Sequence, residues 1–143
     1  MHTLDFFVLG SGSSGNCSLL RLRGNWIMID AGFSMKQTKE RMRTHQVQLD
    51  DVNDVVVTHF DRDHFNPVWC RTFLQRNVRV HIHERHVARA KRAGLDGSCI
   101  VPFTHSMQLH GVEVEAIHFA HDALGTIGFI FDNGIVRFGF ATD

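Results

Sequence analysis

The chain has 143 residues, with 15 basic and 15 acidic side chains and a formal net charge of zero. Hydrophobic residues make up 43% and charged residues 21%, which is typical of a folded globular protein and argues against a disordered chain or a polybasic nucleic-acid-binding arm. The length predicts one domain over residues 1–143.

The first part of the chain alternates apolar runs with turns. The pattern predicts three strands, at residues 4–9, 17–22 and 26–30. A glycine-rich loop at residues 10–16 separates the first two, and Arg23-Gly24-Asn25 forms a short hairpin turn between the others. Ser34-Met35-Lys36-Gln37 fits a capping box, which predicts a helix from there to about His45.

The rest of the chain continues as a mixture of strands and helices. Residues 55–57 are an unbroken β-branched run, typical of a strand covered on both faces. Asn66 and Pro67 resemble the N-cap and first residue of a helix that reaches about Gln75. The further elements expected are a strand at 78–82, a helix at 84–93, a strand at 112–116 and a hairpin with arms at 128–131 and 135–140. Together these elements predict an α/β or α+β layered protein.

The sequence also indicates in which cellular compartment the protein is expected. Residues 1–6 have no basic start followed by an apolar stretch, and no apolar run approaches the roughly 20 residues of a membrane-spanning helix. The three cysteines, Cys17, Cys70 and Cys99, are an odd number without C-x-x-C spacing, which favours buried thiols in a reducing cytosol. We therefore expect a cytoplasmic protein with no membrane partner.

Eleven histidines are many for this length, and the densest group of candidate metal ligands follows the buried strand. These candidates are His59, Asp61, Asp63 and His64. Open α/β sheets place their sites at strand ends, and imidazoles with carboxylates suit Zn²⁺, Mn²⁺ or Fe²⁺. The same residues also fit a polar surface loop whose aspartates cap the next helix, so both interpretations stay open at this point.

A family resemblance favours the metal site. His59-x-Asp61-x-Asp63-His64 resembles the His-x-His-x-Asp-His signature of metallo-β-lactamase-fold hydrolases. Four more segments follow the order seen in the branch of YycJ-like exonucleases and PhnP-like phosphodiesterases: LGSGSSGN at 9–16, IDAG at 29–32, HDA at 121–123 and ATD at 141–143. The resemblance covers essentially the whole chain and implies an αββα sandwich, in which two sheets pack face to face with helices outside.

The resemblance also implies the ligands of two divalent metal ions, with zinc preferred and manganese or iron as alternatives. His59, His121 and the residue at 61 would hold the first ion, Asp63 and His64 the second, and Asp143 both. Two such ions can share a hydroxide that attacks phosphorus. Asp63 would act in catalysis by orienting that water or handling a proton, and Thr58 and Asp30 would fix the ligand rotamers.

The chain departs from the family pattern in two ways. Asp61 stands where the family has its second histidine, and a carboxylate shifts the preference from zinc toward manganese or iron. Flavodiiron relatives also carry a carboxylate there, although theirs is the longer glutamate. The sequence stops at Asp143, where the family's second half begins, so we expect a truncated chain with the first sheet and the start of the second. The apolar region with Phe129, Phe131, Phe138 and Phe140 would then be uncovered.

Other residues have simpler interpretations. We expect His81 and His83 to be surface histidines, and His118 either to line the cleft or to lie in the core or rim. Arg62 could bind a substrate phosphate or neutralise the neighbouring acids. The loop at 10–16 is better explained as a tight turn than as a phosphate cradle, and the spacing of Trp69 and Phe73 places both in the core.

Three functions are compatible with the sequence. The branch resemblance favours a metal-dependent hydrolase of phosphodiesters, acting on DNA or on a small cyclic or nucleotide ester. The same fold and chemistry would also serve a lactone, thioester or β-lactam hydrolase. The third possibility is a truncated, non-catalytic module of the same fold.

Overall fold

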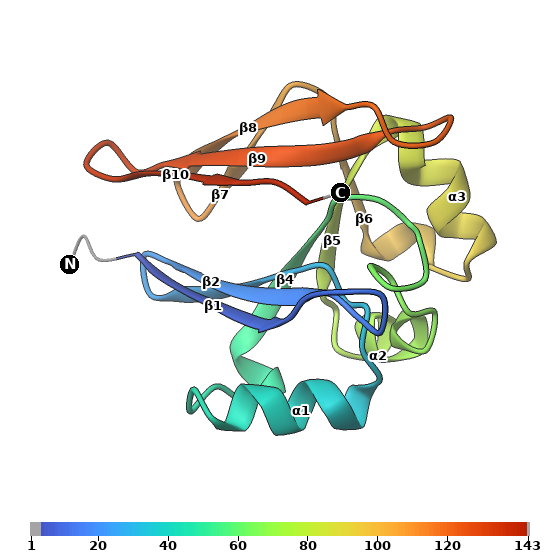
Figure 1. Cartoon of the computed structure of the whole chain (residues 1–143), viewed down its shortest axis with the longest axis horizontal. Coiled ribbons are helices and arrows are strands. Elements are labelled where there is room, and N and C mark those ends of the chain that lie inside the picture. The colour runs from blue at the N-terminus through green and yellow to red at the C-terminus, as the bar shows by residue number, and fades with distance from the viewer. Residues whose placement is uncertain (1–3, 143) are drawn as a thin grey trace.

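The computed structural model describes residues 4–142 as two packed β-sheets flanked by helices (Figure 1). The first sheet has six strands in the order β1-β2-β3-β4-β5-β6. Their bounds are β1 Asp5–Gly10, β2 Cys17–Leu22, β3 Asn25–Ile29, β4 Val52–Val57, β5 Arg79–His83 and β6 Ile100–Phe103. The first three strands pair antiparallel, and the pairs from β3 to β6 are parallel, so β4, β5 and β6 end at the same edge of the sheet.

The second sheet has four antiparallel strands in the order β10-β9-β8-β7. Their bounds are β7 Ser106–Leu109, β8 Val112–Phe119, β9 Thr126–Asp132 and β10 Arg137–Phe140. The β9–β10 hairpin predicted around Asp132-Asn133-Gly134 is confirmed, with Gly134 in the left-handed region at φ 89°. The strand predicted at 112–116 is also confirmed and continues to Phe119.

The helices are α1 Met35–Arg43, α2 Trp69–Gln75 and α3 Val87–Arg92, with 3₁₀ turns η1 Leu49–Asp51, η2 Glu84–His86 and η3 Gly97–Cys99. The capping box is present, because Ser34 and Gln37 satisfy each other's backbone N–H groups. The prediction that α2 has its N-cap at Asn66 and its first residue at Pro67 is wrong by two residues. The backbone N–H of Asn66 donates to Ala31 at 2.8 Å, which ties this segment to the end of β3 and delays the helix.

Two hydrophobic cores lie on opposite faces of the first sheet. Val55 and Val57 of β4 pack in the core under the helices, whereas Val56 packs in the core between the sheets, as expected for a strand covered on both faces. Trp69 and Phe73 are buried and stacked at a centroid distance of 5.3 Å, which confirms their core assignment. Helices α1 and α2 lie against the outer face of the first sheet, and within residues 4–142 no helix covers the second sheet (Figure 1).

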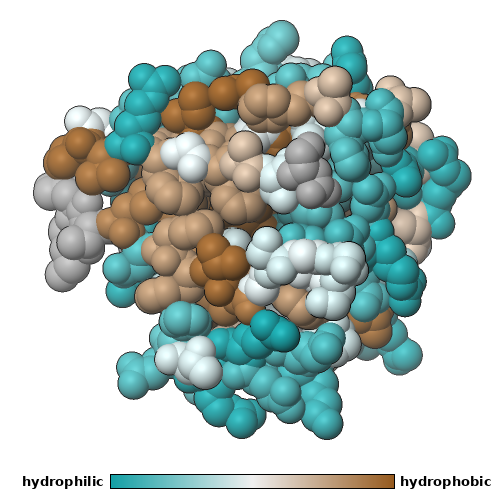
Figure 2. Space-filling view, in the orientation of Figure 1, coloured by the Kyte–Doolittle hydropathy of each residue, from teal (hydrophilic) through white to brown (hydrophobic). Residues whose placement is uncertain are grey.

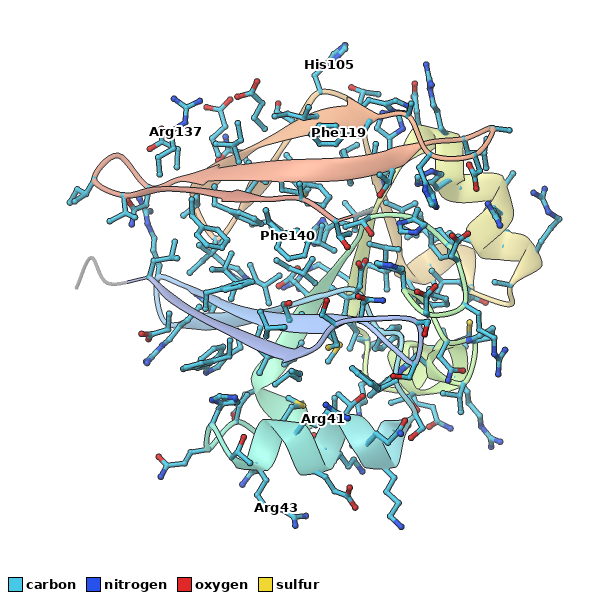
Figure 3. All side chains as sticks on the ribbon, in the orientation of Figure 1. Arg41, Arg43, His105, Phe119, Arg137 and Phe140 are labelled. Atoms are coloured by element: carbon cyan, nitrogen blue, oxygen red, sulfur yellow. The ribbon has the colours of Figure 1, made fainter. Side chains whose placement is uncertain are left out.

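A cavity of about 390 Å³ opens between β1 and β10, on the side where Figure 2 shows apolar surface between the two sheets. The expectation that all four phenylalanines near it are uncovered is wrong for Phe129 and Phe131, which are fully buried between the sheets. Phe138 and Phe140 are half-buried, because their rings pack on Phe6 of β1 at 4.7 and 5.9 Å. Phe140 accordingly points toward the first sheet (Figure 3).

A buried carboxylate organises the interior between the sheets away from the strand ends. Asp54 accepts hydrogen bonds of 2.8 Å from Arg79, His81 and His110. Burial opposes the charge on Asp54, but these three donors outweigh it and hold the pKa of Asp54 well below its ordinary value. The interpretation of His81 as a surface residue is therefore wrong: it is 5% exposed and belongs to this cluster.

The two packed sheets with helices on the outer face of the first confirm the α/β sandwich predicted from the sequence. None of the helices in the described part of the chain has the length and apolar character needed to span a membrane.

Candidate metal centre

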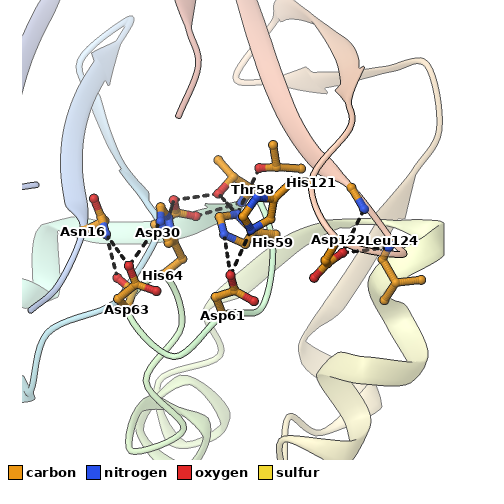
Figure 4. A network of polar contacts seen from close by, with 12 residues as sticks. Asn16, Asp30, Thr58, His59, Asp61, Asp63, His64, His121, Asp122 and Leu124 are labelled. Carbon is orange, nitrogen blue, oxygen red and sulfur yellow. Dashed lines mark hydrogen bonds and ion pairs between the residues drawn. The ribbon is translucent and has the colours of Figure 1, made fainter. Parts of the chain in front are cut away.

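The candidate centre lies at the edge of the sandwich where the two sheets meet (Figure 4). Residues 58–64 follow β4 of the first sheet, and residues 120–125 connect β8 to β9 in the second. The backbone N–H of Ile127 donates to the carbonyl of Thr58 at 3.0 Å, which joins the two sheets next to the centre. Segments that are about 60 residues apart in sequence therefore share one small volume.

His59, Asp61 and His121 form the tightest group of candidate ligands. Their ligand atoms all lie within 4.8 Å of one another. Oδ2 of Asp61 is 3.4 Å from Nε2 of His59 and 3.0 Å from Nε2 of His121. The hydrogen bond with His121 keeps the pKa of Asp61 below its ordinary value, so the carboxylate is ionised at neutral pH.

The ring of His59 is held in one orientation. The hydroxyls of Thr58 and Thr126 each lie 3.0 Å from Nδ1 of His59, which leaves Nε2 facing Asp61. The ring is 2% exposed, and this burial, followed by the proximity of His64, lowers the pKa of His59. A buried, neutral imidazole with one nitrogen fixed by a neighbour is the form in which histidine binds metal ions.

His64 and Asp63 form a second group beside the first. The His59 and His64 rings lie 4.1 Å apart, and Nε2 of His64 is 3.7 Å from Oδ2 of Asp63. Nδ1 of His64 donates to Oδ2 of Asp30 at 2.7 Å, so a neutral His64 carries its proton on Nδ1 and presents Nε2 as a ligand nitrogen. Asp30 also accepts from the backbone N–H and the hydroxyl of Thr58, both at 2.8 Å.

Asp30 accepts these hydrogen bonds from an unusual backbone conformation. Its φ is 62°, in the left-handed region that costs free energy for most side chains. This conformation at the end of β3 turns the carboxylate of Asp30 into the interior, where it reaches both Thr58 and His64. The expectation that Asp30 and Thr58 support the candidate ligands agrees with these contacts.

The loop that carries Asp63 is fixed against two other segments. Asn16 donates its backbone N–H to the carbonyl of Asp63 at 2.7 Å and its side-chain amide to Oδ2 at 3.2 Å. A Cβ on Gly32 would lie 1.8 Å from the same carbonyl oxygen, so only glycine permits this approach. The loop at 10–16 is a turn closed by Asn16, as expected, since Asn16 also bonds both polar backbone groups of Gly12.

The arginine that faces the acids is not the one the sequence suggested. Arg62 is exposed and makes no ion pair with a carboxylate of residues 4–142. Instead Nη2 of Arg89, on α3, lies 3.6 Å from Oδ1 of Asp61. No sequence motif marked Arg89, because its approach depends on how α3 packs beside the strand ends.

Three contacts connect residues 84–92 to the segment that carries His121. The guanidinium of Arg85 donates to His118 at 3.3 Å, Nε2 of His86 to the carbonyl of Gly125 at 3.0 Å, and the guanidinium of Arg89 to Asp122 at 3.3 Å. His86 is 1% exposed, and burial lowers its pKa to about 4. The sequence analysis did not single out His86, since nothing in its spacing distinguishes it from an ordinary helical residue.

The donor set fits a divalent cation. Of the residues predicted as ligands, five lie in the described part of the chain and gather at this edge: His59, Asp61, Asp63, His64 and His121. Asp143 lies outside the described residues. Imidazole nitrogens and carboxylate oxygens in one partly buried volume are the donors that zinc, manganese and iron accept.

Comparison with known proteins agrees with this arrangement. A family model described as the metallo-beta-lactamase superfamily matches residues 10–143. The chain belongs to this superfamily. Solved structures of similar fold include a di-zinc metallo-beta-lactamase and a diiron chemotaxis sensor, and their metal ions agree with the donor set at the strand ends.

Individual relatives share the fold at low sequence identity. The chain is 25% identical over 146 residues to the exodeoxyribonuclease YycJ of Bacillus anthracis, covering 98% of this chain and 54% of YycJ. Among solved structures, the metallo-beta-lactamase fold protein YhfI of Bacillus subtilis has a TM-score of 0.73 at 8% identity, covering 98% of this chain and 63% of YhfI. The short form of human tRNase Z has a TM-score of 0.66 at 16% identity, covering 99% of this chain and 69% of that protein. The chain thus spans about half the length of the curated relative that it matches.

Proposed function

We propose that this protein is a metal-dependent hydrolase of phosphodiesters. The observation that carries the proposal is that the ligand atoms of His59, Asp61 and His121 lie within 4.8 Å of one another, in a chain that belongs to the metallo-beta-lactamase superfamily. The choice of a phosphodiester substrate is supported by YycJ, which is described as an exodeoxyribonuclease, and by tRNase Z.

The proposed ligands divide into two groups. His59, Asp61 and His121 would hold one divalent cation, and Asp63 with His64 would hold a second. Asp143 is proposed to bridge the two ions. Because a carboxylate replaces an imidazole at position 61, we expect manganese or iron to compete with zinc at the first position.

The protein's own side chains would prepare the site for hydrolysis. Bound divalent cations supply Lewis acidity, which polarises a phosphoryl oxygen and lowers the pKa of water. The hydroxyls of Thr58 and Thr126 orient His59, and the carboxylate of Asp30 orients His64. Asp63 is proposed to hold the proton of the attacking water, because Asn16 donates to its carboxylate and fixes it beside His64.

The test is hydrolysis of an activated aryl phosphodiester by the full-length protein with Mn²⁺ or Zn²⁺. We expect His59→Ala and Asp63→Ala each to lower kcat by at least about 100-fold, since each removes a ligand or proton acceptor. His45→Ala is the control, because His45 stacks on Phe7 at the far side of the first sheet. Activity that survives both substitutions would exclude the mechanism. A lactone, a thioester and a β-lactam assayed alongside would reveal a carbonyl hydrolase if turned over faster.

A further inference from the structure

A second pocket lies one strand away from the candidate metal centre. It has a volume of about 340 Å³ and is lined mainly by residues that follow β5 and β6 and by β8, including His83, Arg85, Thr104 and His118. Val57 of β4 pairs with Ile82 of β5, so His83 lies level with Thr58, the residue before His59. His118 lies three residues before His121 on the same segment. The pocket and the centre therefore share one edge of the sandwich.

The hydrogen bonds of the half-buried His83 and the exposed His118 leave one ring N–H of each as a donor in the pocket. The backbone N–H of Arg85 donates to Nδ1 of His83 at 3.1 Å, so a neutral His83 carries its proton on Nε2. The guanidinium of Arg85 can only donate, so Nε2 of His118, 3.3 Å away, accepts and the proton of His118 is on Nδ1. Within the described part of the chain, neither of these two ring N–H groups has a hydrogen-bond acceptor.

The ring of His118 lies against the backbone of Gly125. A Cβ on Gly125 would lie 2.3 Å from Nε2 of His118, so the ring occupies space that only a glycine leaves open. Gly125 has φ 78° and accepts a hydrogen bond from the buried His86, which fixes this stretch of chain. The ring of His83 lies 5.9 Å from that of His118 and 5.6 Å from that of Phe103.

The charges in the pocket favour an anion. Arg85 is permanently cationic and uses one of its N–H groups on His118, which leaves the others for a ligand. The hydroxyl of Thr104 adds a donor, and His105 stands at the rim, where it points to solvent (Figure 3). Among the residues of the described chain that line the pocket, Glu84 is the one acid. A pocket lined by a guanidinium, a hydroxyl and two imidazole N–H groups suits a tetrahedral oxyanion better than a cation.

We propose that this pocket binds a phosphate group of the substrate adjacent to the one that is cleaved. The inference rests on the proposed phosphodiesterase function and narrows its substrate to molecules with at least two phosphates, such as an oligonucleotide or a nucleotide diester with a terminal phosphate. His83 and His118 donate to the phosphate oxygens, Arg85 neutralises the charge, and Glu84 limits the affinity.

The first experiment measures binding without catalysis. The full-length protein is freed of metal with a chelator and titrated with inorganic phosphate, while the ring nitrogens of its histidines are followed by NMR. We expect saturable shifts at His83 and His118, about tenfold weaker binding in Arg85→Gln and about threefold tighter binding in Glu84→Gln. Arg71→Gln, an exposed arginine on α2, is the matched control and should bind like the parent. The absence of saturable shifts, or equal affinity in Arg85→Gln and the parent, would overturn the proposal.

The second experiment separates this proposal from the proposed function. The metal-loaded protein is assayed on an aryl phosphodiester with one phosphate and on a dinucleotide with a 5′-phosphate. We expect Arg85→Gln to raise KM about tenfold for the dinucleotide alone, with kcat little changed. If phosphate binds the pocket but neither ester is hydrolysed, the proposed function fails and the pocket stands as an anion site. If both esters are hydrolysed and KM is unchanged in Arg85→Gln, the pocket proposal fails and the function stands.

Discussion

Arg89 and Asp61 form an ion pair across the candidate metal centre, with Nη2 of the arginine 3.6 Å from Oδ1 of the carboxylate. The other oxygen, Oδ2, faces Nε2 of His121 at 3.0 Å. The two oxygens of Asp61 thus have different roles, since one is held by α3 and the other is directed at the histidines. An aspartate has a shorter reach than the histidine it replaces, and an anchor on one oxygen compensates by fixing where the other one lies.

This arrangement predicts that Arg89 positions Asp61. Arg89→Met should weaken the binding of Mn²⁺ or Zn²⁺ by about 10-fold or more, because partners that orient ligands typically contribute that much to metal affinity. Competition with a chelating dye would measure the change. Arg92→Met, an exposed residue on the same helix, is the matched control. Unchanged or tighter metal binding in Arg89→Met would mean that the arginine opposes the cation rather than supporting its ligand.

The close approach of Gly32 to the carbonyl of Asp63 predicts that no larger residue fits at position 32 without moving the loop. Gly32→Ala places a methyl group 1.8 Å from that oxygen and must displace the loop that carries Asp63 and His64. We expect the free energy of unfolding to fall by about 1–3 kcal/mol and metal affinity to fall with it. Gly139→Ala is the control, since nothing lies within 4 Å of the added methyl group there. Equal urea midpoints for the two variants would contradict this prediction.

The contacts of Asp30 predict a metal-binding defect that leaves the fold intact. Asp30→Asn keeps the side-chain shape and tolerates φ 62°, but one oxygen becomes a donor that faces either Thr58 or His64. We expect metal affinity to drop by about 10–100-fold. The thermal midpoint of the metal-free protein should change less than it does in Asp30→Ala. Asp5→Asn, at a half-buried position at the start of β1, controls for the loss of one negative charge. A metal affinity equal to that of the parent would show that Asp30 does not orient His64.

The elements that could be predicted from the sequence are those fixed by residues close together in the chain. The capping box at Ser34, the turn at Gly134 and the β-branched run in β4 are signals within a few residues, and the structure has each of them. The start of α2 was misplaced because Asn66 is held by Ala31, a partner that local sequence does not reveal. His81 was misjudged for the same reason, because its acceptor is Asp54 on a neighbouring strand.

The residues of the candidate site also differ in whether neighbours in the sequence or distant contacts bring them together. His59, Asp61, Asp63 and His64 are close in sequence, and their grouping follows from the strand end that precedes them. His121 was found only through the family resemblance. The sequence did not reveal the places of Arg89 and His86, nor the pocket at His83 and His118. They depend on the packing of residues 84–92 against the turn after β8, and no periodicity in the sequence indicates this packing. The role of Asp143 stays a prediction.

Burial of His86 predicts an acid-sensitive fold. Its pKa is lowered from the ordinary value of 6.5 to about 4, so between these values the unfolded chain binds a proton that the folded chain does not. The free energy of unfolding should therefore fall as pH decreases from about 6.5 to about 4, by up to about 3 kcal/mol from this residue. Urea denaturation of the metal-free protein at several pH values would measure it.

His86→Gln provides the comparison for that measurement. Glutamine keeps an N–H donor for the carbonyl of Gly125 but does not titrate. The variant should lose stability less steeply over the same pH range, although its packing can lower the stability at neutral pH. Parallel pH profiles for the variant and the parent would show that other groups cause the acid sensitivity.

His121 follows β8 of the second sheet and His59 follows β4 of the first, and this placement has a mechanical consequence. An ion coordinated by both would cross-link the two sheets of the sandwich at this end. Loading with metal would then slow the separation of the sheets, and its removal by a chelator would loosen the sandwich at this end first.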